Sequence, residues 1–162
     1  MAQEDFFLKI EPNVKGECQV DGHTDEIHLH SFSFGVTNAA TGGSNLGSGA
    51  SRSNVQDLHC TKDTDKSSPV LFIGCANGKH YDKATLTIRR AGEHPVDYLK
   101  YEMNEVFITS FSQSGHEGGG LAQESVSINF SKIKMSYWPQ DEKGAQGEIV
   151  TQTFDVKKYK TG

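Results

Sequence analysis

The segment Ser67–Tyr81, SSPVLFIGCANGKHY, carries residues that could bind a phosphate group. A P-loop wraps an anion in backbone N–H groups between two glycines that are four residues apart and are followed by Lys and Ser or Thr. Here only three residues separate Gly74 from Gly78, and His80 stands where the magnesium-binding hydroxyl would be. The segment is therefore predicted to turn the chain rather than to bind a nucleotide.

The same segment carries the signals that begin and end a helix. Ser67 and Ser68 precede Pro69, and serine followed by proline in the first turn is a common helix start. Asn77 and Gly78 are typical of a left-handed helix end, because glycine adopts a positive φ at no steric cost. We predict a short amphipathic helix of about two to three turns, over about residues 67–77, that packs against a sheet.

Histidines and cysteines could together bind a metal ion. His28 and His30 alternate along an expected strand, so both rings lie on one face, which suits zinc. The other candidate ligands are His59, Cys60, Cys75 and His80. The chain has no C-x-x-C or H-E-x-x-H motif, and no third group is visible that would orient Cys60 or Cys75 as a nucleophile. Buried thiols and solvated histidines are the simpler interpretation, so no metal and no cofactor are expected.

Pairs of carboxylates could act as general acid and base. The pairs are Asp25–Glu26, Glu102 with Glu105, and Asp141–Glu142. Each fits a solvated strand face or a turn more simply. The basic end Lys157–Lys160, KKYK, could pair with acidic patches on another copy of the chain, although a solvated terminus is the simpler interpretation. No enzymatic activity is predicted.

The length of 162 residues fits a single domain, residues 1–162. Sixteen basic and twenty-one acidic residues give a net charge of −5, so nucleic acid, with its anionic backbone, is not an expected partner. The N-terminal MAQEDFFLKI does not resemble a signal peptide, and no segment approaches the ~20 apolar residues of a membrane helix. Three cysteines, an odd number, favour reduced thiols and folding in the cytoplasm, so export would use a route without a cleaved leader.

Alternating apolar residues predict a protein made mainly of strands. Phe6–Ile10 and Ala84–Ile88 are apolar at every second position, and Tyr98–Phe111 is rich in β-formers. The apolar parity changes twice within extended runs, which predicts a bend at each place. These changes lie between Ile27/Leu29 and Phe32/Phe34, and near Ser131–Lys132, between Val126/Ile128/Phe130 and Ile133/Met135/Tyr137. Bent strands are typical of a curled, barrel-like sheet.

Two segments are predicted to be flexible loops. Thr37–Ser53, TNAATGGSNLGSGASRS, is almost wholly small and polar, and Ser112–Gly120, SQSGHEGGG, is a second such tip between long strands. Neither can bury enough apolar area to offset the entropy of ordering. The long loop is either a surface loop or a segment that becomes ordered against a partner.

Several motifs occur together in order and at characteristic spacing. They are Asn54–Leu58, Asp65–Pro69, Gly78–Tyr81 and Ala84–Gly92, with further likeness at Phe6–Ile10, Tyr98–Leu99, Val126–Phe130, Tyr137 and Pro139–Gln140. Over nearly its whole length the chain resembles the Hcp family, the haemolysin-coregulated proteins that form the inner tube of bacterial type VI secretion systems.

The resemblance implies a mainly β fold, a two-sheet β-barrel with one short flanking α-helix and a long extended loop. It also implies that six copies form a ring and that rings stack into a hollow tube. The expected partners are other copies of the chain, a contractile sheath, a trimeric spike and small effector proteins in the lumen. The protein would be assembled in the cytoplasm and exported without a cleaved signal peptide, and no catalysis is implied.

The resemblance also assigns roles to particular residues. The long loop would reach an adjacent subunit or ring. Its candidate contact residues are Asn38, Thr41, Ser44, Leu46, Ser48 and Arg52. Ser31 and Ser33 would line the lumen, while Phe32 and Phe34 would face the core. The three cysteines and the lysine-rich end lie outside the family pattern.

Two other functions stay open at this point. One is a secreted effector in which an Hcp-like domain carries its own toxic activity, although 162 residues leave no room for an added domain. The other is a β-barrel that binds a ligand through its loops. Both long loops lack Trp, Tyr and Phe, the residues that such binding sites usually use.

Overall fold

The computed structural model describes residues 4–38, 53–92, 94–141, 144–158 and 160–161. Its helix is α1 (Ser68–Asn77). The strands are β1 (Glu4–Glu11), β2 (Ile27–Leu29), β3 (Ser31–Ser33), β4 (Val36–Asn38), β5 (Ser53–Val55), β6 (Leu58–Asp63), β7 (His80–Arg90), β8 (Val96–Ser114), β9 (Gln123–Asn129), β10 (Lys132–Tyr137), β11 (Val150–Asp155) and β12 (Lys160–Thr161). No helix among these residues has the length and apolar character to cross a membrane.

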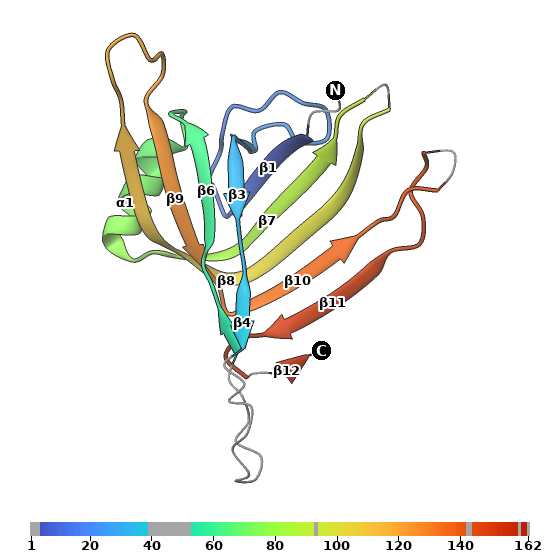
Figure 1. Ribbon diagram of the computed structural model, residues 1–162. Helices are drawn as coiled ribbons and strands as arrows, with labels where there is room; N and C mark the ends of the chain where they lie inside the picture. Colours follow the sequence, from blue (N-terminus) through green and yellow to red (C-terminus); the bar gives the residue numbers. More distant parts are fainter. Residues whose placement is uncertain (1–3, 39–52, 93, 142–143, 159, 162) are drawn as a thin grey trace.

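The main sheet curls back on itself, as Figure 1 shows. Its antiparallel ladders run from β2 through β1, β7, β8, β9 and β6 to β3. Strands β2 and β3 are not hydrogen-bonded to each other, but they follow one another in the chain through His30, whose N–H donates to the Thr61 carbonyl at 2.8 Å. The covalent chain therefore joins the two ends of the path, and β10, β11 and β12 extend the sheet from β8.

The predicted bend near Ser131–Lys132 is a corner where two strands turn together, whereas at the other predicted bend the chain changes partner, from β1 for β2 to β6 for β3. The first half of β8 pairs with β10, as far as Asn104 opposite Lys132, and the second half pairs with β9, starting at Phe107 opposite Asn129. The register is the same on both sides of this point, so β9 and β10 form one bent run along β8. At the corner, Glu105 has a φ of 50°, a conformation that few non-glycine residues adopt. The apolar parity of β8 changes at this residue, because Met103 and Val106 are both buried.

The core lies inside the curl. It includes five side chains that are each less than 2% exposed: Leu8, Leu86, Met103, Val106 and Ile128. They belong to β1, β7, β8 and β9, where most apolar side chains alternate with polar ones on the other face. Phe7 is an exception in β1, because it is fully buried although it lies on the opposite face from Leu8. The fold class is therefore the expected one: mainly β, with two sheets and one short flanking helix.

Helix α1 begins and ends at the predicted residues. Pro69 lies in the first turn, and Gly78 ends the helix in the left-handed conformation, with a φ of 64°. The expected capping is not observed, because the Ser67 side chain makes no capping hydrogen bond and instead donates to the Asp65 carboxylate. The helix is also not amphipathic, as its outer side exposes large apolar side chains.

The second sheet is a two-stranded ribbon of β4 and β5, with Thr37 opposite Asn54. Thr37, Asn38 and Ser53, expected at the ends of a loop, therefore lie in strands. Paired strands satisfy each other's backbone N–H and C=O groups, so the ends of this polar segment can be ordered without burying apolar side chains.

Candidate functional site

One face of the curled sheet is covered with small hydroxyl side chains. It is built by β3, β6, β9 and the second half of β8, which lie side by side in that order. Residues directly opposite each other in an antiparallel ladder point to the same face. One row across the strands is Ser31–Thr61–Ser125–Ser112, and the next is Ser33–His59–Ser127–Ser110.

We call these eight residues, together with Asp63, Ser114 and Gln123 in the third row, the hydroxyl face. The opposite side of the same strands carries the apolar row Phe32–Cys60–Val126–Phe111, directed to the core, and next to it the polar row Lys62–Glu124–Gln113. The face has no large apolar side chain, so it offers a polar wall with little to hold another surface by the hydrophobic effect.

Hydrogen bonds tie the side chains of the hydroxyl face to one another. Ser31 Oγ lies 2.5 Å from Thr61 Oγ1, and His59 Nδ1 lies 2.6 Å from Ser127 Oγ. His30 Nε2 lies 2.9 Å from Asp63 Oδ1. Hydrogen bonds from His30 and Gln123 lower the pKa of Asp63 below its usual value.

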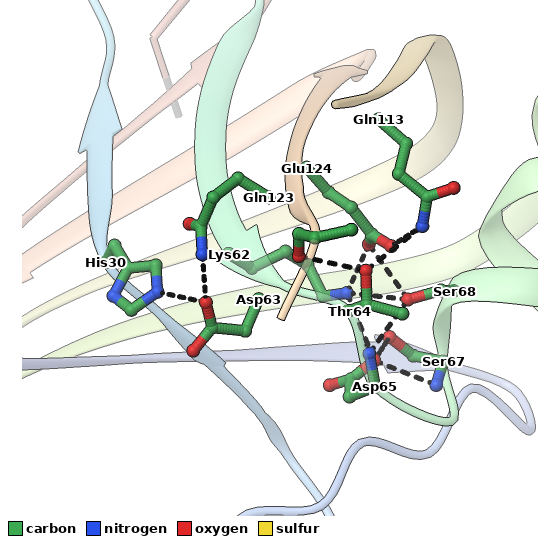
Figure 2. A network of polar contacts seen from close by, with 11 residues as sticks. His30, Lys62, Asp63, Thr64, Asp65, Ser67, Ser68, Gln113, Gln123 and Glu124 are labelled. Atoms are coloured by element: carbon green, nitrogen blue, oxygen red, sulfur yellow. Dashed lines mark hydrogen bonds and ion pairs between the residues drawn. The ribbon is translucent and has the colours of Figure 1, made fainter. Parts of the chain in front are cut away.

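A buried charge network fixes the start of α1 to the sheet, as Figure 2 shows. Lys62 is 1% exposed, and its Nζ lies 2.5 Å from Glu124 Oε1 and 3.0 Å from Asp65 Oδ1. Lys62 Nζ also donates to Ser68 Oγ at 3.1 Å, so each of its three protons has an acceptor. Gln113 Nε2 donates to the second oxygen of Glu124 at 2.8 Å.

This network was not predicted from the sequence, although a signal exists. Lys62 follows Leu58 and Cys60 at core parity, and Glu124 precedes Val126 and Ile128 at core parity. A charged residue at a core position needs a buried partner, because an isolated buried charge is very unfavourable. Two such residues of opposite sign in one chain therefore indicate a cross-strand ion pair.

The cysteine and histidine candidates do not assemble into a reactive centre. Burial raises the pKa of the Cys60 thiol to about 12, which disfavours the nucleophilic thiolate. His59 points to the hydroxyl face, the opposite side of β6 from Cys60, and His28 lies 3.5 Å from Asp5. Within the described residues, no group of three or more His, Cys, Asp and Glu side chains could hold a metal ion.

The carboxylate pairs are engaged in separate ion pairs. Glu102 contacts Lys83 at 3.1 Å and Lys134 at 3.8 Å, and Glu105 contacts Lys157 at 2.7 Å. Of the other carboxylates, Glu26 contacts His23 at 3.0 Å, and Asp141 accepts a hydrogen bond from the Ala145 N–H. Glu142 lies outside the described residues.

Two apolar surfaces remain open to solvent. The first is the outer side of α1, where Val70, Phe72 and Ile73 are 41%, 55% and 51% exposed. No residue of α1 carries a charge. We call these three side chains the helix surface.

The second is an apolar groove of about 310 Å³ between the β4–β5 ribbon and the strands β10 and β11. Its apolar side chains are Phe34, Val36, Val55, Ile133, Met135 and Phe154. The core-facing side of β10 becomes progressively uncovered along the strand, with Ile133 8%, Met135 41% and Tyr137 42% exposed. The sheet thus extends beyond the core that it covers.

The structure brings some of the predicted site residues together. Ser31 and Ser33 are exposed and neighbour one another on β3, while Phe32 and Phe34 pack against the core. Asn38 is exposed at the end of β4. The other predicted loop residues, Thr41, Ser44, Leu46, Ser48 and Arg52, lie outside the described residues.

Comparison with known proteins gives consistent matches. A family model described as "Type VI secretion system effector, Hcp" matches residues 7–137. Protein hcp1 of Pseudomonas aeruginosa is 41% identical over 143 residues, which make up 88% of this chain and 88% of that protein. The crystal structure of Hcp1 from Salmonella typhimurium has a TM-score of 0.80 and 32% identity, with 100% of both chains covered. A structure described as a type six secretion system protein shares the fold, with a TM-score of 0.90 at 24% identity over 99% of this chain and 100% of that one.

The fold and the matches together define a protein of the type VI secretion class. Within that class, the chain belongs to the Hcp family, because the family model and a relative at 41% identity both match most of its length. The resemblance that the sequence motifs indicated is therefore confirmed.

Proposed function

We propose that this chain is the structural subunit of a six-membered ring, and that rings stack into the inner tube of a type VI secretion system. The hydroxyl face lines the lumen and contacts small effector proteins. The tube is enclosed by a contractile sheath and capped by a trimeric spike. It is assembled in the cytoplasm and exported from the cell, and the subunit has no catalytic activity of its own.

The observation that carries this proposal is the hydroxyl face. A lumen wall must let a folded protein enter and leave, so it should be polar and free of large apolar side chains. The rows from Ser31 to Ser112 and from Ser33 to Ser110 have these properties across four adjacent strands.

The two lateral edges of this wall support a ring. Within the described residues, β3 pairs only with β6, and β8 beyond Phe107 pairs only with β9. An unpaired edge is a site where another chain can add. The two open edges belong to different strands, so a contact between them is head-to-tail, and such contacts form a ring where the rotation from copy to copy closes.

Solution mass and microscopy test the assembly. We expect light scattering after gel filtration to give about 107 kDa, six copies of the 17.8 kDa chain. A chain shortened between Asn38 and Ser53 should keep that mass but form no tubes in negative-stain images, if the loop mediates stacking. A monomeric unshortened chain would contradict the ring, and normal tubes from the shortened chain would contradict the role of the loop.

Ser33→Gln tests the lumen. The larger side chain would stand in the path of a bound effector. We therefore expect the variant to retain effector about tenfold more weakly in a pull-down, a loss of ~1.4 kcal/mol in binding free energy, while the ring mass stays unchanged. The control is Thr85→Gln on β7, outside both the hydroxyl face and the apolar groove, which should leave retention unchanged. Equal retention in both variants would argue against a cargo contact at Ser33, and loss of the ring in Ser33→Gln would place Ser33 in an interface between subunits.

A further inference from the structure

The segment 12–26, which we call the strap, joins β1 to β2 and folds back over the outer face of β1. Phe7 points to this face, away from the core, and yet is 0% exposed. The ring of His23, a strap residue, lies flat on the Phe7 ring, with the centroids 4.2 Å apart and 7° between the planes. His23 thus covers an aromatic side chain that the core does not cover.

Both ring nitrogens of His23 face carboxylates. Nδ1 lies 3.0 Å from Glu26 Oε2 in the strap itself, and Nε2 lies 3.2 Å from Asp97 Oδ2 and 3.3 Å from Asp97 Oδ1 on β8. A carboxylate can only accept hydrogen bonds, and a neutral imidazole has one N–H and one lone pair. The neutral ring therefore satisfies one carboxylate and turns a lone pair toward the other, whereas the charged ring donates to both.

The other charged groups around this site favour the same form of the ring. Arg89 on β7 donates from Nε to Asp97 Oδ1 at 3.0 Å, so His23 and Arg89 share this carboxylate. On β1 and β2, Asp5 and His28 contact each other at 3.5 Å. With His23 charged, two cations face two carboxylates. Loss of its proton leaves an excess of negative charge around a ring that is only 6% exposed.

We propose that His23 is a proton-dependent latch, which holds the strap on the sheet when its ring is charged and releases the strap when the ring is neutral. The latch is closed at low pH, because only the charged ring donates to both carboxylates. It loosens as the pH rises past the range in which histidine ordinarily loses its proton. Release uncovers Phe7 on the outer face of the sheet. The inference goes beyond the proposed function, because the latch belongs to a single chain and does not require a ring.

The hydrogen bonds that fasten the strap to the neighbouring strands converge on this site. His23 binds a carboxylate on β8, and Arg89 Nη2 on β7 donates to the Asp21 carbonyl of the strap at 3.5 Å. Backbone hydrogen bonds of the strap connect its own residues, as from the Cys18 N–H to the Glu26 carbonyl at 3.1 Å. The strap can therefore keep its own turns when its contact with β8 is lost.

Labelling of Cys18 with iodoacetamide reports the position of the strap. Cys18 lies on the strap and is 7% exposed, whereas Cys60 in the core is 1% exposed, and mass spectrometry of peptides distinguishes the two thiols. Each variant is compared with the unsubstituted chain at the same pH, so the pH dependence of the reaction itself cancels. We expect His23→Gln to be labelled at Cys18 about tenfold faster than the unsubstituted chain at about pH 5.5, and less than about twofold faster at about pH 8.5, where the unsubstituted latch is already loose.

Asp97→Asn tests the role of the proton. The introduced amide keeps an oxygen that accepts from Arg89 and gains an NH2 that donates to the Nε2 lone pair of the neutral His23 ring. The strap should then stay closed at high pH, so we expect Cys18 to be labelled about fivefold more slowly than in the unsubstituted chain at about pH 8.5. If Asp97 only packed against the strap, its replacement would speed the labelling instead.

A matched control and the core thiol complete the experiment. His116→Gln removes an exposed histidine from the turn between β8 and β9, and it should be labelled like the unsubstituted chain at both pH values. Labelling of Cys60 in His23→Gln would show that this variant has lost its fold, and Asp97→Asn, which leaves the His23 ring in place, then decides. The latch is overturned if His23→Gln changes the labelling of Cys18 by the same factor at both pH values. It is also overturned if Asp97→Asn is labelled at least as fast as the unsubstituted chain at about pH 8.5.

Discussion

Lys62→Met is expected to lower the free energy of unfolding by about 3–5 kcal/mol, among the largest effects of a single substitution in this chain. Lys62 is buried between Glu124 and Asp65, and its removal leaves both carboxylates without the cation that balances them. Methionine fills a similar volume, so the loss comes from the uncompensated charge rather than from a cavity. Urea unfolding followed by circular dichroism, at one fixed protein concentration, measures it.

Two further variants separate the ion pair from the effect of removing any lysine. Lys66→Met, three residues before Pro69 on the exposed approach to α1, should change stability by less than ~0.5 kcal/mol. Lys62→Met with Glu124→Gln should recover part of the loss, because a neutral amide oxygen can still accept from Ser68 and carries no charge to bury. A loss below ~1 kcal/mol in Lys62→Met alone would show that the network contributes little to stability.

Gly74→Ala is expected to cost about 1–3 kcal/mol, even though alanine favours a helix. A Cβ at residue 74 would overlap the Tyr81 hydroxyl and approach a ring carbon of Tyr81 to 3.3 Å. Tyr81 is 1% exposed, so moving its ring would disturb the side chains packed around it. Thermal unfolding of the variant against the unsubstituted chain measures the cost.

A change in Tyr81 should reverse this effect. The Tyr81 hydroxyl has no hydrogen-bond partner among the described residues, so Tyr81→Phe alone should be neutral or slightly stabilising. Combined with Gly74→Ala, it removes the overlapping atom and should restore most of the stability. Gly92→Ala is the control, because a Cβ there meets nothing within 4 Å, and it should have little effect. If Gly74→Ala lowers stability equally in the Tyr81→Phe background and in the unsubstituted chain, the loss does not come from overlap with the Tyr81 hydroxyl.

Local patterns predicted the parts of the fold that depend on neighbours in sequence. Pro69 and Gly78 bound α1 as expected, because backbone dihedral preferences act within one or two residues. The parity change near Ser131 predicted the corner, since alternation along a strand records which face is buried. The outer side of α1 was wrongly expected to be polar, although Val70, Phe72 and Ile73 are plainly apolar in the sequence.

Residue types and short-range spacing were enough to predict most of the elements, the apolar faces of the strands and the family. Strand pairing became visible in the folded chain alone, and it aligned Ser31 with Thr61, Ser125 and Ser112 from segments far apart in the sequence. It likewise joined Lys62 to Glu124, which is 62 residues away, and left the groove open beside β10. Contacts of this range arise from the register of long-range ladders, which no local pattern records.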